Sequence, residues 1–240
     1  MMNRVFLLAL PILPCLGGPT ARSATPNQII PFVGCPAEGM SGPVAAPTGS
    51  GMPISLPVAL ATRLAHYAAD GMDVLAPRGW HCIEVYGSDG AVLLVTPELL
   101  ALNELRAVRP LRGPVVELSY LNGWTSGRFD VARVMARLFP WCRAFVRRVI
   151  QEGLEPARTF LVGPYPADKM TRHGRSEVEF TTPAGRIGMG TAMDRISPSE
   201  MPVSGLARLT TQDGVTLLDV RLPAGLRPLT AAIIQFSRSR

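Results

Sequence analysis

The segment 80–86, "WHCIEVY", gathers side chains of types that take part in catalysis: His81, Cys82, Glu84 and Tyr86. A cysteine nucleophile needs an imidazole within hydrogen-bond reach of its sulfur. The segment is rich in strand formers, and successive side chains of a strand point to opposite faces. His81 and Cys82 are therefore expected to point apart, and so are His81 and Glu84, which argues against a Cys–His pair and against a metal site here.

A serine hydrolase is the first alternative. Ser126, in "NGWTSGRF", follows an expected strand and precedes an expected helix, which is the context of a nucleophile elbow without its G-x-S-x-G spacing. Thr125 or Ser126 can equally cap that helix, and capping explains both residues without catalysis. A catalytic Ser126 would need His81 or His173 to reach it from elsewhere in the chain.

Paired carboxylates are the second alternative. Glu177 and Glu179 are spaced to emerge on one face of an expected strand, "SEVEFTTP". Two such groups can act as acid and base on a glycosidic bond, although most pairs of this kind form the solvent side of a half-buried strand. The catalytic candidates of the sequence are therefore Ser126, His81, His173, Glu177 and Glu179.

Two irregular segments, "LVGPYPADKM" at 161–170 and "TTPAGRIGMGT" at 181–191, are rich in glycine and proline. Long irregular loops in a compact domain often bind ligands. The second loop lacks both the G-x-G-x-x-G spacing and a Walker lysine, and no cysteine or histidine pair has zinc spacing, so we expect no cofactor and no metal. We expect the two loops to line a ligand site with the strand that bears Trp80. The candidate binding residues are Trp80, His81, Tyr165 and Lys169.

These side chains must be positioned by the surrounding elements. The pattern predicts a helix over 56–71 and a hairpin over 80–96. If Asp89 and Gly90 form the turn, Tyr86 faces Leu93 and Glu84 faces Val95. A short helix is predicted at 96–105 and a strand at 113–123.

The second half of the chain is predicted to begin with helices at 125–139 and 140–153. A strand at 176–183, a hairpin over 204–223 around Asp213 and Gly214, and a closing helix at 224–240 follow. This order predicts an α+β fold, with a mainly antiparallel sheet built around two hairpins and packed by three to four helices. We expect residues 58–240 to form a single domain.

The N-terminus has the layout of a secretory signal peptide over residues 1–23. Arg4 precedes an apolar run at 5–16, and small residues follow up to an acceptable cleavage site before Ala24. An uncleaved interfacial anchor and a lipoprotein linked through Cys15 are the alternatives. Residues 24–57 are rich in proline and glycine and predict an extended arm. Because no later apolar run reaches membrane-spanning length, we expect a periplasmic or secreted mature chain without a transmembrane segment.

Three cysteines lie outside the predicted signal peptide: Cys35, Cys82 and Cys142. In an oxidising compartment two of them should pair, and the sequence allows all three pairings. We favour a disulfide between Cys35 and Cys82, because Cys142 lies in an apolar helical stretch where a free cysteine packs as a small hydrophobic residue.

The formal net charge is +6, and Lys169 is the only lysine among the cations. Arginine spread along a chain rich in Ala, Gly and Pro is typical of a composition bias and argues against a nucleic acid as partner. The densest cluster lies on the two middle helices. We call it the arginine patch, and it consists of Arg128, Arg133, Arg137, Arg143, Arg147 and Arg148. A solvated helix face is the favoured interpretation, with anion binding as the alternative.

Five segments carry a resemblance to known sequences: "FVGCPAEGMSGP", "APRGWHCIEVYGSDG", "TSGRFDVARVMARLFP", "EFTTPAGRIGMGT" and "VRLPAGLRPLTAAIIQ". Here the chain resembles exported proteins of proteobacteria-like sources to which no activity is assigned. The resemblance covers most of the predicted mature chain. It implies export and carries over no catalytic residue.

The function expected from the sequence is that of a non-catalytic binding or structural module of the cell envelope, with an envelope or extracellular component as its partner. The alternative is an envelope hydrolase. It would use Ser126 with a histidine, or the pair Glu177 and Glu179, as its catalytic apparatus.

Overall fold

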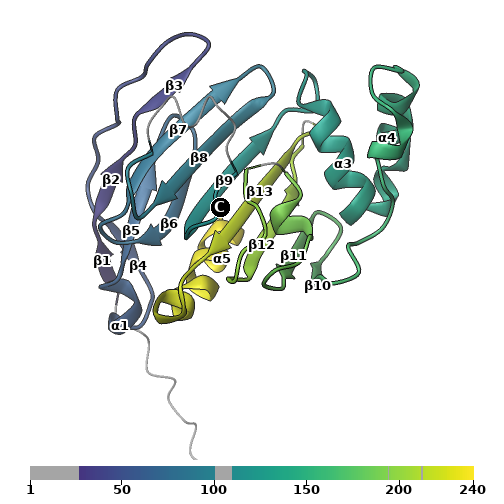
Figure 1. Ribbon diagram of the computed structural model, residues 1–240. Coiled ribbons are helices and arrows are strands. Elements are labelled where there is room, and N and C mark those ends of the chain that lie inside the picture. Colours follow the sequence, from purple (N-terminus) through teal and green to yellow (C-terminus); the bar gives the residue numbers. More distant parts are fainter. Residues whose placement is uncertain (1–26, 101–109, 194, 212) are drawn as a thin grey trace, which may run out of the picture.

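A computed structural model describes residues 27–100, 110–193, 195–211 and 213–240 (Figure 1). The signal peptide predicted at 1–23 and half of the helix predicted at 96–105 lie outside these ranges. Among the described residues, no helix is long and apolar enough to cross a membrane.

An eight-stranded sheet dominates the described chain, with the strand order β10-β11-β12-β13-β9-β8-β7-β3. Neighbouring strands are antiparallel except at the edge, where β3 pairs with β7 in parallel. The strands are β3 (Ala37–Gly39), β7 (His81–Gly87), β8 (Gly90–Thr96), β9 (Val115–Leu121), β10 (Lys169–His173), β11 (Glu177–Thr182), β12 (Val203–Leu209) and β13 (Val215–Arg221).

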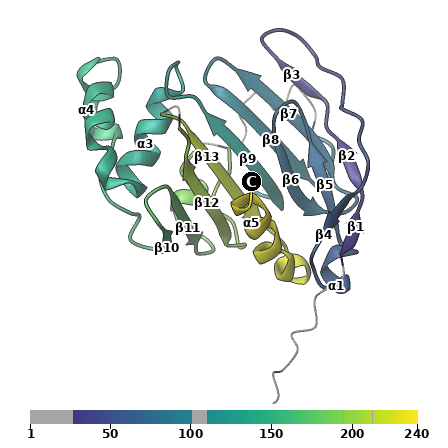
Figure 2. The same cartoon turned by 180° about the vertical axis from the view of Figure 1, so that it is seen from behind.

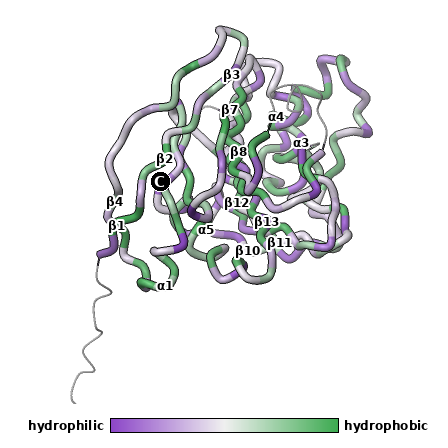
Figure 3. Tube along the Cα trace, turned by 60° about the vertical axis from the view of Figure 1, so that its left-hand side comes forward, coloured by the Kyte–Doolittle hydropathy of each residue, from purple (hydrophilic) through white to green (hydrophobic). Residues whose placement is uncertain are grey.

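The predicted α+β class is confirmed, whereas the prediction of a sheet built around two hairpins needs correction. The hairpins β7–β8 and β12–β13 are both present, but they are joined through β9 into one sheet. Their strands consist mainly of hydrophobic residues, shown in green along the trace in Figure 3, and such strands are usually covered on both faces. An isolated hairpin is only marginally stable. In one sheet, the same helices and the small sheet can cover both hairpins.

The first hairpin has a different register from the predicted one. Gly87 lies opposite Gly90, so the turn residues are Ser88 and Asp89, and Tyr86 faces Ala91. Gly90 is the first residue of β8, and this position requires glycine because β9 approaches it closely. A Cβ atom there would lie 1.8 Å from the carbonyl oxygen of Tyr120, and its φ of +146° also favours glycine.

The helix predicted at 56–71 is wrong for most of its length. It is replaced by the short helix α1 (Val58–Ala61) followed by the strand β5 (Leu64–Ala68). The first four residues of β5 are buried, and a short apolar run of that kind has no period that separates a strand from a buried helix. β5 lies between β2 (Phe32–Gly34) and β6 (Asp73–Pro77) in a three-stranded sheet.

The predicted arm, 24–57, contains four short strands. Besides β2 and β3 these are β1 (Gln28–Ile30) and β4 (Met52–Ile54), which pair with each other. β2 and β3 each pair in parallel with a strand of the predicted domain. The described part of the arm therefore lies against the rest of the chain.

The two faces of the large sheet are covered differently. On one face α5 (Thr230–Arg238) and the three-stranded sheet enclose a core, and α5 lies in front of β13 in Figure 2. On the other face α3 (Arg128–Leu138) and α4 (Arg143–Gln151) pack over β11, β12 and β13. Short 3-10 turns complete the chain: η1 (Pro140–Cys142), η2 (Ala157–Thr159), η3 (Met189–Thr191) and η4 (Ala224–Leu229).

Candidate functional site

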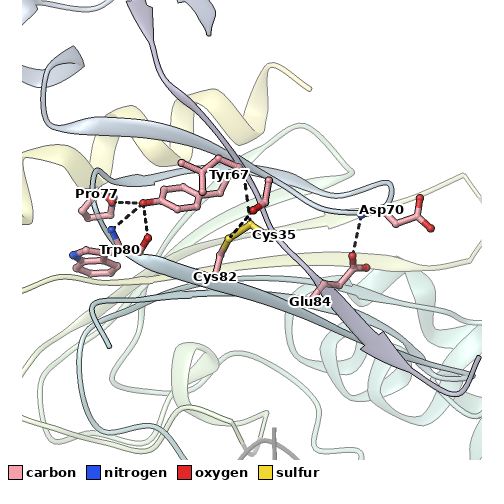
Figure 4. The surroundings of a disulfide bond; sticks show 9 residues. Cys35, Tyr67, Asp70, Pro77, Trp80, Cys82 and Glu84 are labelled. Atoms are coloured by element: carbon pink, nitrogen blue, oxygen red, sulfur yellow. Dashed lines mark hydrogen bonds between the residues drawn. A yellow bond between two sulfur atoms is a disulfide. The ribbon is translucent and has the colours of Figure 1, made fainter. Parts of the chain in front are cut away.

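The predicted disulfide between Cys35 and Cys82 is confirmed (Figure 4). It joins residues 47 positions apart in sequence and ties the segment between β2 and β3 to the second residue of β7. Cys142 is a free thiol, and burial raises its pKa. Because the thiolate is the reactive form, this shift makes Cys142 a poor nucleophile at neutral pH.

Trp80 is held through its backbone by Tyr67. The hydroxyl of Tyr67 donates to the carbonyl of Pro77 at 2.8 Å and accepts from the amide of Trp80 at 3.0 Å (Figure 4). Tyr67 is fully buried, and burial raises its pKa. The Trp80 ring packs against the core on the α5 side of the sheet. This arrangement accounts for Trp80 as a packing residue.

The serine and histidine candidates lie far apart. Ser126 is exposed, and its Oγ lies 3.1 Å from Oγ of Ser88. The N-cap residue of α3 is Gly127, so the predicted capping by Thr125 or Ser126 is wrong. His81 is on β7 and His173 on β10, with five strands between them in the sheet order. The fold therefore does not bring these two histidines together.

Glu177 and Glu179 share one face of β11, as the strand pattern predicted. Each carboxylate has a different cationic or titratable partner. Glu177 accepts from Nε of Arg208 at 2.7 Å and from Nε of Arg238 at 3.4 Å, whereas Oε2 of Glu179 lies 3.3 Å from Nε2 of His173. The two glutamates thus make separate surface contacts.

The two irregular loops meet at Asp168. Its carboxylate accepts from Oγ1 of Thr182 and from the amide of Met189, each at 2.8 Å. Tyr165 packs in the core on the α3 side of the sheet, and the guanidinium of Arg137 lies 3.9 Å from its ring centroid. Trp80 packs on the opposite face, so the structure joins the loops to each other but not to the strand that bears Trp80. Lys169 is exposed on the edge strand β10.

A pair of buried carboxyl groups that the sequence analysis did not select lies at the centre of the sheet. Glu117 on β9 and Asp219 on β13 are directly opposite each other, and each side chain is 4% exposed. Directly opposite residues in an antiparallel pair have Cβ atoms about 5 Å apart. The signal available in the sequence was a charged residue inside each of two apolar strands, "VVELSYL" and "VTLLDVR".

One oxygen of each carboxyl group lacks a hydrogen-bond partner. Oε1 of Glu117 accepts from the hydroxyl of Ser119 at 3.1 Å. Within the part of the chain that the structure describes, Oε2 of Glu117 and Oδ1 of Asp219 are buried without any partner. Buried polar atoms are nearly always paired, so two such atoms on neighbouring strands suggest a role other than packing.

Burial raises the pKa of both carboxyl groups. For Glu117, burial is opposed by the charge of Arg195 and by the Ser119 hydrogen bond. The pKa of Asp219 lies well above its usual range because of burial first and then the charge of Glu117, with Arg221 acting in the opposite direction. Carboxyl groups with strongly shifted pKa values beside a cavity are typical of functional sites.

Arg221 supplies positive charge near the pair, two residues after Asp219 on β13. It is completely buried, and its guanidinium donates to the carbonyls of Leu111, Gly113 and Ser197 at 2.7 to 2.8 Å. Burial lowers its pKa to about 10, so Arg221 remains charged at neutral pH. These hydrogen bonds go to backbone carbonyl groups and not to Glu117 or Asp219. Arg221 therefore affects the carboxyl pair through its charge.

A pocket of about 340 Å³ opens above Glu117, which we call the Glu117 pocket. Its remaining lining combines strand residues with residues of α3 and of the surrounding loops: Asp89, Val92, Ser119, Leu121, Asp130, Arg133, Thr159, Ala192, Met193, Arg195 and Leu217. Asp219 lies beside this pocket, next to η3. A Cβ atom on Gly190 would lie 3.2 Å from its Oδ1 and only 2.5 Å from Cγ1 of Val203, so η3 packs closely against this region.

Replacing Asp219 by asparagine is expected to raise the free energy of unfolding by about 2 kcal/mol at pH 7.5, because a buried ionisable group without full pairing is destabilising. The folded-state pKa of Asp219 is raised, so the wild type loses stability as the pH rises above about 4, the unfolded-state value. The variant should show a shallower loss over this window. Urea denaturation at several pH values measures both effects.

The control is Glu200→Gln, an exposed carboxylate, which should change stability by less than about 0.5 kcal/mol. A loss of stability in Asp219→Asn at pH 7.5 would contradict this prediction, because it would mean that the aspartate is ionised and well paired in the folded protein.

Comparison of the chain with protein-family models, with curated protein sequences and with solved structures gave no match.

Proposed function

We propose that this protein is an exported binding module of the cell envelope, periplasmic or secreted, whose Glu117 pocket holds a small ligand. The observation that carries the proposal is the buried, unpartnered Oε2 of Glu117 in a pocket of about 340 Å³. A pocket of that volume with a few convergent polar groups is typical of small-molecule sites. The disulfide and the signal-like residues 1–23 support export.

The groups around the pocket indicate the chemistry of the ligand. Oε2 of Glu117 needs a hydrogen-bond donor, and Asp89 adds a second carboxylate to the lining. Asp130 is hydrogen-bonded to Arg133, which also pairs with Glu155, and Arg195 adds a cation to the lining. Val92, Leu121 and Leu217 supply apolar walls. A compact ligand that presents an amine or a hydroxyl group to Glu117 satisfies this arrangement.

Calorimetric titration with glucosamine, glucose and gluconate tests the proposal, because these probes have similar size and differ in charge. We expect saturable binding that weakens in that order. Glu117→Gln should weaken glucosamine binding about tenfold or more, since a hydrogen bond to a charged group contributes about 1.5–3 kcal/mol. Glu179→Gln, on β11 and outside the lining of this pocket, is the matched control.

Equal affinity of Glu117→Gln and the wild type for glucosamine would contradict the assignment of Glu117 as the ligand contact. The absence of saturable binding for all three probes would contradict the ligand class.

An envelope hydrolase is the second candidate. The observation that favours it is the pair of neighbouring carboxyl groups whose pKa values burial raises, since a raised pKa favours the protonated form that can protonate a leaving group. In this form of the hypothesis Glu117 and Asp219 replace the earlier candidates, Ser126 with a histidine or Glu177 with Glu179. Turnover of an aryl glycoside that is lost in Glu117→Gln separates catalysis from binding.

A further inference from the structure

A second pocket lies between α3 and α4, on the side of the molecule where these helices project from the sheet (Figure 1). Its volume is about 380 Å³, and we call it the helix groove. Most of its wall is apolar and comes from Met135, Ala136, Phe139, Pro140, Val146, Ile150, Phe160 and Val162. The groove has the size and the lining of a site for a hydrocarbon group.

α4 lines this groove with one face. Arg143, Val146, Arg147 and Ile150 follow the spacing i, i+3, i+4 and i+7, which places them in one stripe along the helix. Two apolar residues of the stripe therefore alternate with two arginines. A ligand that contacts this stripe meets hydrocarbon and positive charge together.

The two arginines of the groove differ from the rest of the arginine patch. Arg128 is paired with Glu152, Arg133 with Asp130 and Glu155, and Arg148 with Asp213 at 3.7 Å. Arg137 donates to the carbonyl of Gly163 and lies over the ring of Tyr165.

Arg143 and Arg147 make no ion pair or side-chain hydrogen bond with any other residue that the structure describes, and both are exposed. Like charges at i and i+4 repel each other and destabilise a helix. An anion placed between the two guanidinium groups would remove this repulsion.

Apolar side chains continue outward from the groove. Val162, which lines it, is 74% exposed, and its neighbour Leu161 is 54% exposed. An apolar lining that extends into exposed apolar residues beside two unpaired positive charges has the pattern of a site for an amphiphile with an anionic head.

We propose that the helix groove binds the acyl chain of a free fatty acid and that Arg143 and Arg147 hold its carboxylate. Two cations one turn apart suit a single carboxylate, which accepts hydrogen bonds on two oxygens. The concave apolar wall suits one chain rather than the flat surface of a bilayer. Each methylene group that the groove buries makes the transfer of the chain from water more favourable. The site is independent of the Glu117 pocket.

Calorimetric titration of the full chain with decanoate, below the concentration at which it forms micelles, tests the proposal. We expect saturable binding to one site. The double variant Arg143→Gln/Arg147→Gln should bind decanoate at least tenfold more weakly and should bind decanol as the wild type does, because only the head group loses its partners.

The matched control is the double variant Arg78→Gln/Arg227→Gln, which removes the same charge from exposed positions outside the groove and should bind decanoate as the wild type does. Val162→Asp tests the groove independently of the arginines. Because Val162 is largely exposed, the variant should fold normally, and its added negative charge should weaken decanoate binding.

Three results would overturn the proposal. The first is equal weakening by the two double variants, which would indicate a general effect of net charge. The second is binding of decylamine as tight as that of decanoate. The third is binding to phosphatidylglycerol vesicles without saturable binding of decanoate, which would assign the groove to a membrane surface instead.

Discussion

Replacing Cys35 and Cys82 together by serine is expected to lower the free energy of unfolding by about 4 kcal/mol. The bond spans 47 residues, and closing a loop of that length restricts the unfolded chain strongly. The native structure loses little packing in the double variant, because a serine hydroxyl is close in size to a thiol. Urea denaturation of the oxidised wild type and of the double variant gives the difference.

Cys142→Ser is the control for this experiment, because Cys142 is the unpaired cysteine in the part of the chain that the structure describes. It should change the free energy of unfolding by less than about 1 kcal/mol, and it should leave the sensitivity to reducing agents intact. The double variant avoids the mispairing that a single unpaired Cys35 or Cys82 could undergo with Cys142. A loss below about 1 kcal/mol in the double variant would show that the arm is held by its strand pairing alone.

Replacing Arg221 by methionine is expected to lower the free energy of unfolding by about 3–5 kcal/mol. The guanidinium is completely buried and donates to three carbonyl groups, on Leu111, Gly113 and Ser197. Each would lose this donor, and the carbonyl of Leu111 would keep its bonds from the amide and the hydroxyl of Ser197. Loss of the positive charge should also raise the pKa of Asp219 further, since Arg221 lowers it in the wild type. Urea denaturation measures the first effect, and NMR titration of the carboxyl carbons measures the second.

Two further variants separate the roles of Arg221. Arg221→Lys keeps the charge but offers one donor group in place of a planar fork, so it should recover the pKa of Asp219 better than the stability. Arg227→Met, at an exposed position of η4, should change stability by less than about 0.5 kcal/mol. A loss for Arg221→Met no larger than that for Arg227→Met would contradict the role assigned to its hydrogen bonds.

The sequence predicted an element correctly where its hydrophobic period and its boundary residues both indicated the same kind of element. α3 has an apolar stripe of helical period, and β11 alternates strictly between buried and half-buried residues. β5 was missed because its buried run carries no alternation, and its strand conformation depends on pairing with β2 and β6. The register of the first hairpin was missed because Gly90 is required by the approach of β9, which a local pattern does not contain.

The candidate sites were harder to predict, because they depend on contacts between segments distant in sequence. Glu117 and Asp219 each resemble an isolated charge in an apolar strand, and their importance follows from the pairing of β9 with β13. The arginine patch that borders the helix groove can be seen in the sequence. The sequence does not show that, among the described residues, four of its arginines have partners and Arg143 and Arg147 have none. The segment 80–86 is rich in reactive residue types, yet Cys82 is in the disulfide and Trp80 is packed in the core.

The parallel pairing of β3 with β7 has a consequence for aggregation. An uncovered edge strand offers unpaired amide and carbonyl groups to a second chain. β3 covers the edge of β7, and the disulfide holds β3 near that edge, whereas the opposite edge strand β10 carries the exposed charges of Lys169 and Arg172. Until Cys35 and Cys82 are oxidised, the edge of β7 is covered only by its three-residue pairing with β3. Newly made chains kept in a reducing environment should therefore associate through β7 more readily than oxidised chains.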